Sequence, residues 1–193
     1  MDNFKIGFKT YNVVKQIDEQ TFIATQGKKT YYVKNFNGDT HCFYSYYDSH
    51  KKFDNTGIKH PKIKAKDKKR CIIVLDYIEG ENALDLLLKG ELEEKVYEKI
   101  FFQAFVAKIE HKSLNYDPDL YIFSNGELYY MSSEWYDYND ESKFTNRGIR
   151  LWFHTKEFMT FAKDKGKEPD KSLLKEDYEV NKQIVLMTCK YYR

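Results

Sequence analysis

The chain has 193 residues, which suffices for one domain and excludes a long multidomain protein. It carries 32 lysines and arginines against 30 aspartates and glutamates, and the net charge of +2 excludes a strong overall field toward nucleic acid or membrane. The sequence contains no run of about 18 apolar residues and no signal-peptide segment, so it predicts a cytoplasmic protein without a membrane partner.

The cysteines and the aromatic residues bear on two further predictions, the redox compartment of the protein and the kind of partner it binds. Cys42, Cys71 and Cys189 lie far apart and in no metal-ligand spacing, which predicts reduced thiols in a reducing compartment. The 17 tyrosines and 14 phenylalanines could stack on single-stranded nucleic acid. Most of them lie in periodic segments, however, which favours a core role and makes nucleic acid the less favoured partner.

Three strands and a helix are predicted in the first third of the chain. The strands form a β-meander separated by polar turns and cover residues 12–17, 20–25 and 30–35. Aromatic residues at helical spacing then predict a helix that begins at Asp39 or Thr40 and runs through Phe53. We expect this segment to build a small antiparallel sheet with one helix.

A basic run precedes the most apolar strand of the chain. Residues 58–63 read as an extended connector around Pro61, and residues 62–70 as a solvated hairpin tip. The nearly continuous apolar run within 70–77 predicts a strand at the centre of a sheet.

The rest of the chain is mostly helical. Polar residues 79–82 cap a short helix at 83–88, and residues 91–112 place an apolar stripe on one helix face. Asn125-Gly126 predicts a hairpin within about 121–133. Two further helices are predicted at 143–163 and 171–191. Strands that come mostly first and helices that come mostly last indicate an α+β fold.

Four segments share an order and spacing with a known superfamily. Lys34 ends a Thr-Tyr-Tyr-Val-Lys strand, residues 57–63 follow the first helix, residues 74–80 leave the apolar strand, and residues 116–119 precede the hairpin. Together they resemble the protein-kinase-like superfamily, in its compact prokaryotic form related to aminoglycoside and lipopolysaccharide kinases. The resemblance covers residues 11–135.

The resemblance implies a protein-kinase-like two-lobed fold within a single domain. Its β-rich N-lobe would be residues 1–78, a small antiparallel sheet, and its mostly helical C-lobe residues 79–193. Lys34 would contact the phosphates of ATP. The adenine would be carried by the backbone of three hinge residues: Asp76, Tyr77 and Ile78.

The positions that would carry phosphoryl transfer depart from the family pattern. The family uses a His-x-Asp loop, an Asn five residues after that Asp, and an Asp that closes the hairpin. Here Ser113, Asn115, Leu120 and Ser132 hold these four positions. The glycine-rich phosphate loop is also missing, because residues 15–21 contain no glycine.

Three carboxylates remain near the expected catalytic loop. In a shifted register Asp117 would serve as the catalytic base, and Asp119 or Glu134 would hold magnesium. In the alternative interpretation, which we favour, Asp117 and Asp119 cap a turn around Pro118 and Glu134 ends a strand in solvent.

Three functions are consistent with these features. The four replacements favour a pseudokinase, that is, a kinase-like binding or regulatory scaffold with impaired catalysis and an unknown protein partner. The first alternative is a divergent ATP- and Mg-dependent phosphotransferase. The second is an RNA-associated protein that would use the basic run at 62–70.

Overall fold

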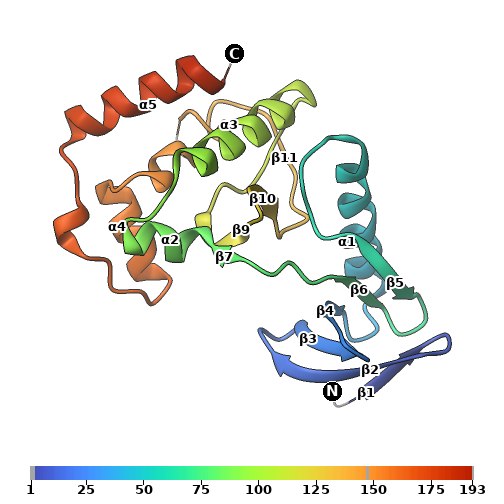
Figure 1. The fold of residues 1–193 in the computed structure, drawn as a ribbon. Helices are drawn as coiled ribbons and strands as arrows, with labels where there is room; N and C mark the ends of the chain where they lie inside the picture. The colour runs from blue at the N-terminus through green and yellow to red at the C-terminus, as the bar shows by residue number, and fades with distance from the viewer. Residues whose placement is uncertain (1–2, 147, 193) are drawn as a thin grey trace. The chain divides into compact units, whose positions relative to one another are not determined.

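The structure is a computed structural model that describes residues 3–146 and 148–192. Its contacts divide the chain into two compact units. The N-terminal unit comprises the residues up to Lys52 together with His60–Ile78, and the C-terminal unit comprises Phe53–Lys59 together with the residues from Glu79 on. Strands dominate the first unit and helices the second, which confirms the predicted α+β class (Figure 1).

The N-terminal unit is built on a six-stranded antiparallel sheet with the order β1-β2-β3-β4-β6-β5 (Figure 1). The strands are β1 (Asn3–Ile6), β2 (Lys9–Gln16), β3 (Thr21–Gln26), β4 (Lys29–Asn35), β5 (Ile63–Asp67) and β6 (Ile72–Asp76). The meander and the central apolar strand are confirmed, whereas β1 and β5 were not predicted. The two edge strands, β1 and β5, come into contact with each other.

Alternation along the strands gives this sheet two apolar faces. Val33 and Val74 face a cluster with Tyr11 and Phe22. The other face is covered by the helix α1 (Thr40–Lys52), whose Phe43 is fully buried in a second cluster. The helix predicted from Asp39 or Thr40 onward is therefore confirmed.

The sequence predicted a solvated hairpin tip over the whole basic run, and the structure confirms it only for Lys68, Lys69 and Arg70, the exposed turn between β5 and β6. Residues 63–67 form β5, and its lysines find partners within the unit. The Nζ atom of Lys64 lies 2.8 Å from a carboxylate oxygen of Asp76, and the ammonium of Lys66 lies 3.8 Å from the ring centre of Tyr47. Long lysine stems cover apolar surface while their charged ends stay near water, which lets a basic segment pair as a strand.

The C-terminal unit combines helices with short strands. The helices are α2 (Ala83–Lys89), α3 (Glu94–Ile109), α4 (Lys156–Asp164) and α5 (Asp177–Tyr191). The strands β7 (Glu81–Asn82), β9 (Tyr121–Ser124) and β10 (Glu127–Tyr130) form one sheet, while β8 (Lys112–Ser113) pairs with β11 (Tyr136–Asp137). The described residues of the unit also form the 3-10 turns η1 (Phe53–Asn55), η2 (Pro118–Leu120), η3 (Gly148–Trp152) and η4 (Lys171–Leu173).

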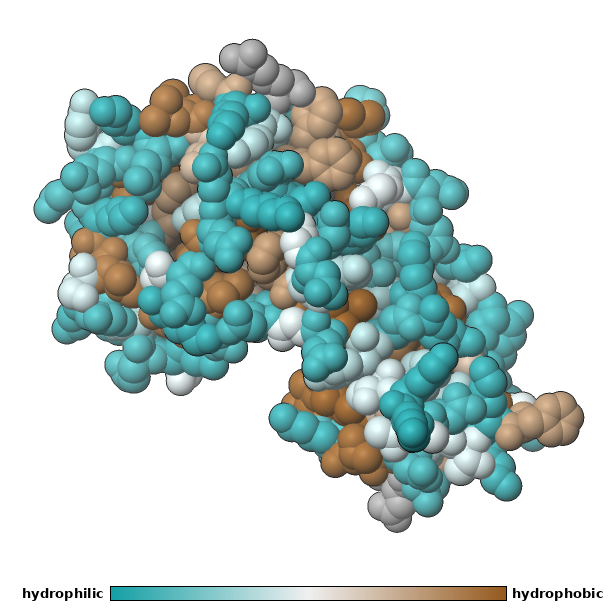
Figure 2. All heavy atoms as spheres, viewed as in Figure 1, coloured by the Kyte–Doolittle hydropathy of each residue, from teal (hydrophilic) through white to brown (hydrophobic). Residues whose placement is uncertain are grey.

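The core of this unit lies between α3 and the β9–β10 hairpin. Phe101, Tyr121, Tyr130 and Trp152 are among its fully buried side chains. Hydrophilic residues cover most of the visible surface (Figure 2). Within residues 3–146 and 148–192, no helix is long and apolar enough to cross a membrane.

Local signals explain the confirmed elements here. The side chain of Asn82 accepts a hydrogen bond of 2.9 Å from the amide of Leu84 and caps α2, while Gly90 ends that helix at a φ of 72°. Asn125 and Gly126 take φ values of 50° and 77°, which a two-residue hairpin turn requires.

Three predicted helices have different bounds. The helix predicted at 91–112 ends at Ile109, which is 59% exposed rather than on the buried face, and His111 stops it at a φ of 54°. The helix predicted at 143–163 is interrupted: η3 precedes Thr155, whose hydroxyl caps α4, and position 147 lies outside the described residues. The helix predicted at 171–191 begins only at Asp177, after η4.

Candidate functional site

The predicted site residues divide between the two units. Lys34, Asp76, Tyr77 and Ile78 belong to the N-terminal unit, whereas the three carboxylates, Asp117, Asp119 and Glu134, belong to the C-terminal unit.

Lys34 faces a polar corner of the N-terminal sheet. It lies opposite Thr21 in the pairing of β3 with β4, and its Nζ donates a hydrogen bond of 2.6 Å to the Thr21 hydroxyl. Burial lowers the pKa of Lys34, while the negative charge of Asp18 partly opposes this effect. The ammonium group therefore already has an oxygen acceptor and an anion beside it.

Asp18 is a residue of this corner that the sequence analysis missed. Its carboxylate accepts hydrogen bonds of 2.8 Å from the amides of Gln20 and Thr21. Burial alone would raise the pKa of Asp18, but the hydrogen bonds from Thr21 and Gln20 and the charge of Lys34 lower it below its usual value. The polar Asp-x-x-Thr turn between two strands was the available signal.

The predicted hinge residues already have contacts within their own unit. The amide of Asp76 donates to the carbonyl of Lys62 at 2.9 Å, and its carboxylate pairs with Lys64. The ring of Tyr77 lies 4.8 Å from that of Tyr32, measured between centroids. Burial, together with the neighbouring Tyr77, raises the pKa of Tyr32 to about 12, so the Tyr32 hydroxyl stays neutral at physiological pH.

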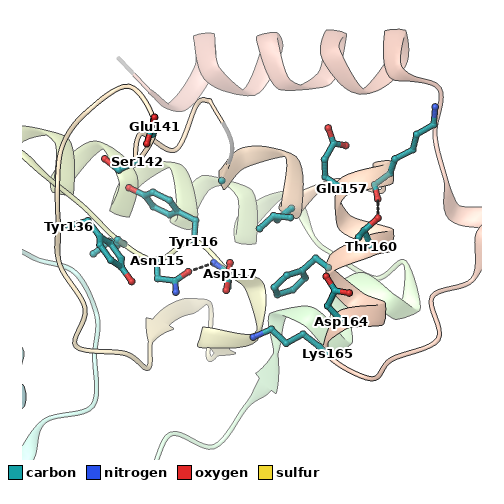
Figure 3. A pocket seen from close by; sticks show the side chains of 15 residues that line it. Asn115, Tyr116, Asp117, Tyr136, Glu141, Ser142, Glu157, Thr160, Asp164 and Lys165 are labelled. Atoms are coloured by element: carbon teal, nitrogen blue, oxygen red, sulfur yellow. Dashed lines mark hydrogen bonds between the residues drawn. The ribbon is translucent and has the colours of Figure 1, made fainter.

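Asp117 begins the η2 turn of the C-terminal unit. Its amide donates a hydrogen bond of 3.1 Å to the side-chain oxygen of Asn115, and its carbonyl accepts from the amide of Leu120 at 3.0 Å. Pro118 occupies the first position of the turn. Asp117 stands at the N-cap position of this turn, where its side chain makes no capping hydrogen bond, and it lines a pocket (Figure 3).

Asp119 joins this turn to other elements. Its carboxylate lies 2.6 Å from the Nζ of Lys165. Its main-chain carbonyl accepts a hydrogen bond of 2.8 Å from the side-chain amide of Asn82. Lys165 directly follows α4, so this ion pair fastens that helix to the η2 turn.

Glu134 belongs to a second hydrogen-bond network, which also includes Asn115 and Tyr136. Its carboxylate accepts a hydrogen bond of 2.8 Å from the hydroxyl of Tyr136 and one of 3.3 Å from the side-chain amide of Asn115. Burial first, and then the Glu134 carboxylate, raises the pKa of Tyr136 to about 12.

Tyr130 and Tyr121 hold the backbone of this loop. The hydroxyl of Tyr130 accepts from the Asn115 amide at 3.2 Å and donates to the Glu134 carbonyl at 3.1 Å. The hydroxyl of Tyr121 donates to the Asn115 carbonyl at 2.9 Å. Both rings are fully buried, so the loop is anchored directly to the core.

We expect Tyr130→Phe to lower the free energy of unfolding by about 1 to 2 kcal/mol, because the Asn115 amide and the Glu134 carbonyl lose their shared partner. Chemical denaturation measures the difference. Tyr129→Phe, at the next position of β10, is the matched control, since strand alternation turns its ring away from this loop. Equal stabilities of the two variants would contradict the role assigned to Tyr130.

The pocket beside Asp117 has a volume of about 820 Å³. Its lining comes from the Leu114–Asp117 segment on one side and from α4, with Thr160 and Asp164, on the other (Figure 3). Four carboxylates line it with two lysines: Asp117, Glu141, Glu157 and Asp164 with Lys156 and Lys165. The size and the mixed lining suit a small polar molecule or a few side chains of a protein partner.

Metal chemistry has little geometric support in the described part of the chain. No group of three or more His, Cys, Asp and Glu side chains there is arranged to hold a metal ion. Of the histidines, His154 bonds through Nε2 to the carbonyl of Leu87 at 2.8 Å, which is a structural use of the ring.

No protein-family model matches the chain, and no curated protein matches its sequence.

Proposed function

We propose that this chain is a kinase-like binding protein with impaired catalysis, which acts as a regulatory scaffold for a protein partner. Its C-terminal pocket is the surface that we assign to binding.

The bonding of Asn115 is the observation that carries the proposal. This residue holds the position where the family has its catalytic aspartate, and an amide side chain cannot act as a base at physiological pH. Its main-chain amide and carbonyl bond to Tyr130 and Tyr121, while its side chain bonds to Asp117 and Glu134. A residue with four protein partners serves as a support of the loop.

The corner around Lys34 supports the same proposal. Catalysis of phosphoryl transfer depends on positive groups that neutralise the phosphates. Here the ammonium of Lys34 is bonded to Thr21, and the carboxylate of Asp18 in the adjoining turn would repel a phosphate. Magnesium-dependent nucleotide binding should therefore be weak.

The arrangement of elements is consistent with the proposed scaffold. In the N-terminal unit one helix, α1, is inserted between β4 and β5 of an antiparallel sheet. In the C-terminal unit a long helix precedes a loop and a hairpin. Fold similarity alone does not establish a reaction, so the proposal depends on the site residues.

We expect millimolar ATP to leave the thermal midpoint of the wild type unchanged with or without magnesium, because a ligand raises the midpoint only if it binds the folded state. Lys34→Ala should behave in the same way. Lys28→Ala, at an exposed turn of the same hairpin, controls for loss of a charge. No phosphate should be released from labelled ATP.

A magnesium-dependent rise that Lys34→Ala abolishes and Lys28→Ala preserves would overturn this proposal. It would favour the divergent phosphotransferase, with Asp117 as its base, Asp119 or Glu134 at its metal, and the hinge backbone at its nucleotide. One observation speaks for that second candidate: Asp117 lines the pocket of about 820 Å³ in the C-terminal unit.

A further inference from the structure

One phenylalanine stands fully in solvent at the turn between β1 and β2. Phe8 has a relative exposure of 108%, above that of any other large apolar residue among those described, and it follows Gly7, whose φ is 58°. Ile6 and Lys9 form the last pair of the hairpin, so the turn is tight. The end of this hairpin carries a hydrophobic projection with hydrophilic residues around it (Figure 2).

The hairpin behind Phe8 is firmly packed. Phe4 and Tyr11 face each other in the pairing of β1 with β2, their rings stack with centroids 5.1 Å apart, and both are buried. The exposed ring is therefore held at the end of a rigid support.

Basic residues surround this turn. Lys5 and Lys9 are exposed on the same hairpin, and Arg70 donates a hydrogen bond to the carbonyl of Lys5. That bond brings the β5–β6 turn, with exposed Lys68 and Lys69, beside β1. The carboxylate of Asp67 also lies in this group, and it is paired with Arg70 at 2.7 Å.

The charged residues are divided unequally between the two units, which the small net charge of the whole chain does not show. By sequence, the N-terminal unit holds 14 of the 32 lysines and arginines but seven of the 30 aspartates and glutamates. Its surface is therefore basic, while the acidic excess belongs to the other unit.

We propose that this hairpin surface, formed by Phe8 with Lys5, Lys9, Lys68, Lys69 and Arg70, binds an anionic lipid bilayer. The phenyl ring enters the interface between headgroups and acyl chains, and the basic side chains lie at the level of the anionic headgroups. The proposal does not rest on the kinase-like function, and it departs from the absence of a membrane partner predicted by the sequence.

The geometry favours a bilayer over single-stranded nucleic acid. Nucleic-acid platforms use several aromatic rings on an open face, along which successive bases stack. This surface offers a single ring, which has no hydrogen-bonding group and projects from a turn. A single apolar side chain can insert into a bilayer interface, and its insertion is favourable because it removes the apolar surface of the ring from water.

The test is sedimentation of the full chain with phosphatidylcholine vesicles, with and without phosphatidylserine. We expect binding to the vesicles with phosphatidylserine, weakened by salt, and a roughly tenfold loss for Phe8→Ser. Lys68→Ala with Lys69→Ala should also cost roughly tenfold or more. Phe8→Trp should bind as well as the wild type and add emission that shifts to the blue on binding. Val14→Ser, at a residue 60% exposed on β2, is the matched control and should bind unchanged.

Two results would overturn the proposal. The first is that the chain binds neither kind of vesicle, or binds them equally well with and without Phe8. The second is that a single-stranded oligouridine binds and Phe8→Ser weakens it while the vesicles do not bind, which would assign the hairpin surface to nucleic acid.

Discussion

Replacing Trp152 with alanine is expected to lower the free energy of unfolding by about 3 to 5 kcal/mol, the usual loss for a large buried ring. Trp152 is fully buried in the main core of the C-terminal unit. Its ring meets Tyr121 edge to face at 5.1 Å, and its indole nitrogen donates to the carbonyl of Tyr116 at 2.8 Å. The variant loses the packing and leaves that carbonyl without its donor.

Phenylalanine at the two tryptophan positions separates these effects. Trp152→Phe keeps an aromatic ring but loses the bond to Tyr116, and we expect about 1 to 3 kcal/mol of destabilisation from the buried carbonyl. Within the described residues, the buried indole nitrogen of Trp135 has no hydrogen-bond acceptor. Trp135→Phe should therefore cost less than Trp152→Phe, because it removes a polar group that is not bonded.

Chemical denaturation followed by circular dichroism measures all three variants. If Trp152→Phe and Trp135→Phe lost equal stability, the hydrogen bond from Trp152 to Tyr116 would not contribute measurably to the free energy of unfolding. If Trp152→Ala lost less than about 1 kcal/mol, the core assignment itself would be wrong.

Short-range signals made much of the fold predictable. The meander, the β9–β10 hairpin and the caps of α2 depend on neighbours a few residues apart, such as Asn125 with Gly126 and Asn82 with Leu84. Such patterns can be read from one sequence because the residues that decide the backbone lie within the same turn.

The wrong predictions concern segments decided by distant contacts. The strand β5 forms in a basic segment because β6 pairs with it and Tyr47 receives Lys66. The helix predicted at 143–163 breaks because the η3 turn places Trp152 in the core and Thr155 at a cap. Periodicity cannot show where tertiary packing overrides helix propensity.

The site was predictable in its residue types and not in its bonds. The sequence identifies Asp117 and Glu134 as carboxylates next to a hairpin. It does not reveal that the buried Tyr130 and Tyr121 hold the backbone of Asn115, and with it the loop of Asp117, against the core. These partners come from separate elements, and the α4 side of the pocket begins some 40 residues later in the chain. Whether the carboxylates bind a ligand stays a prediction.

Gly80→Ala is expected to lower the free energy of unfolding by about 3 kcal/mol, because the added methyl group has no space. A Cβ atom at this position would lie 2.3 Å from the carbonyl oxygen of Phe123 and 2.9 Å from the side chains of Ile122 and Ser124. The carbonyl cannot move freely, since Phe123 is paired with Leu128 on one side and with Glu81 on the other.

The strain of Gly80→Ala should be relieved by separation of β7 from β9, and this movement would reach the candidate site. Gly80 directly precedes β7, and Asn82 of β7 caps α2 and donates through its side chain to the carbonyl of Asp119 in the loop of Asp117. Hydrogen exchange should show faster amides in β7 and β9, and denaturation should show the loss of stability. Glu81→Ala, an exposed position on the same strand, is the matched control and should change neither measurement by much. Normal exchange in both strands of the Gly80→Ala variant would mean that β7 accommodates the methyl group and does not constrain the Asp117 loop.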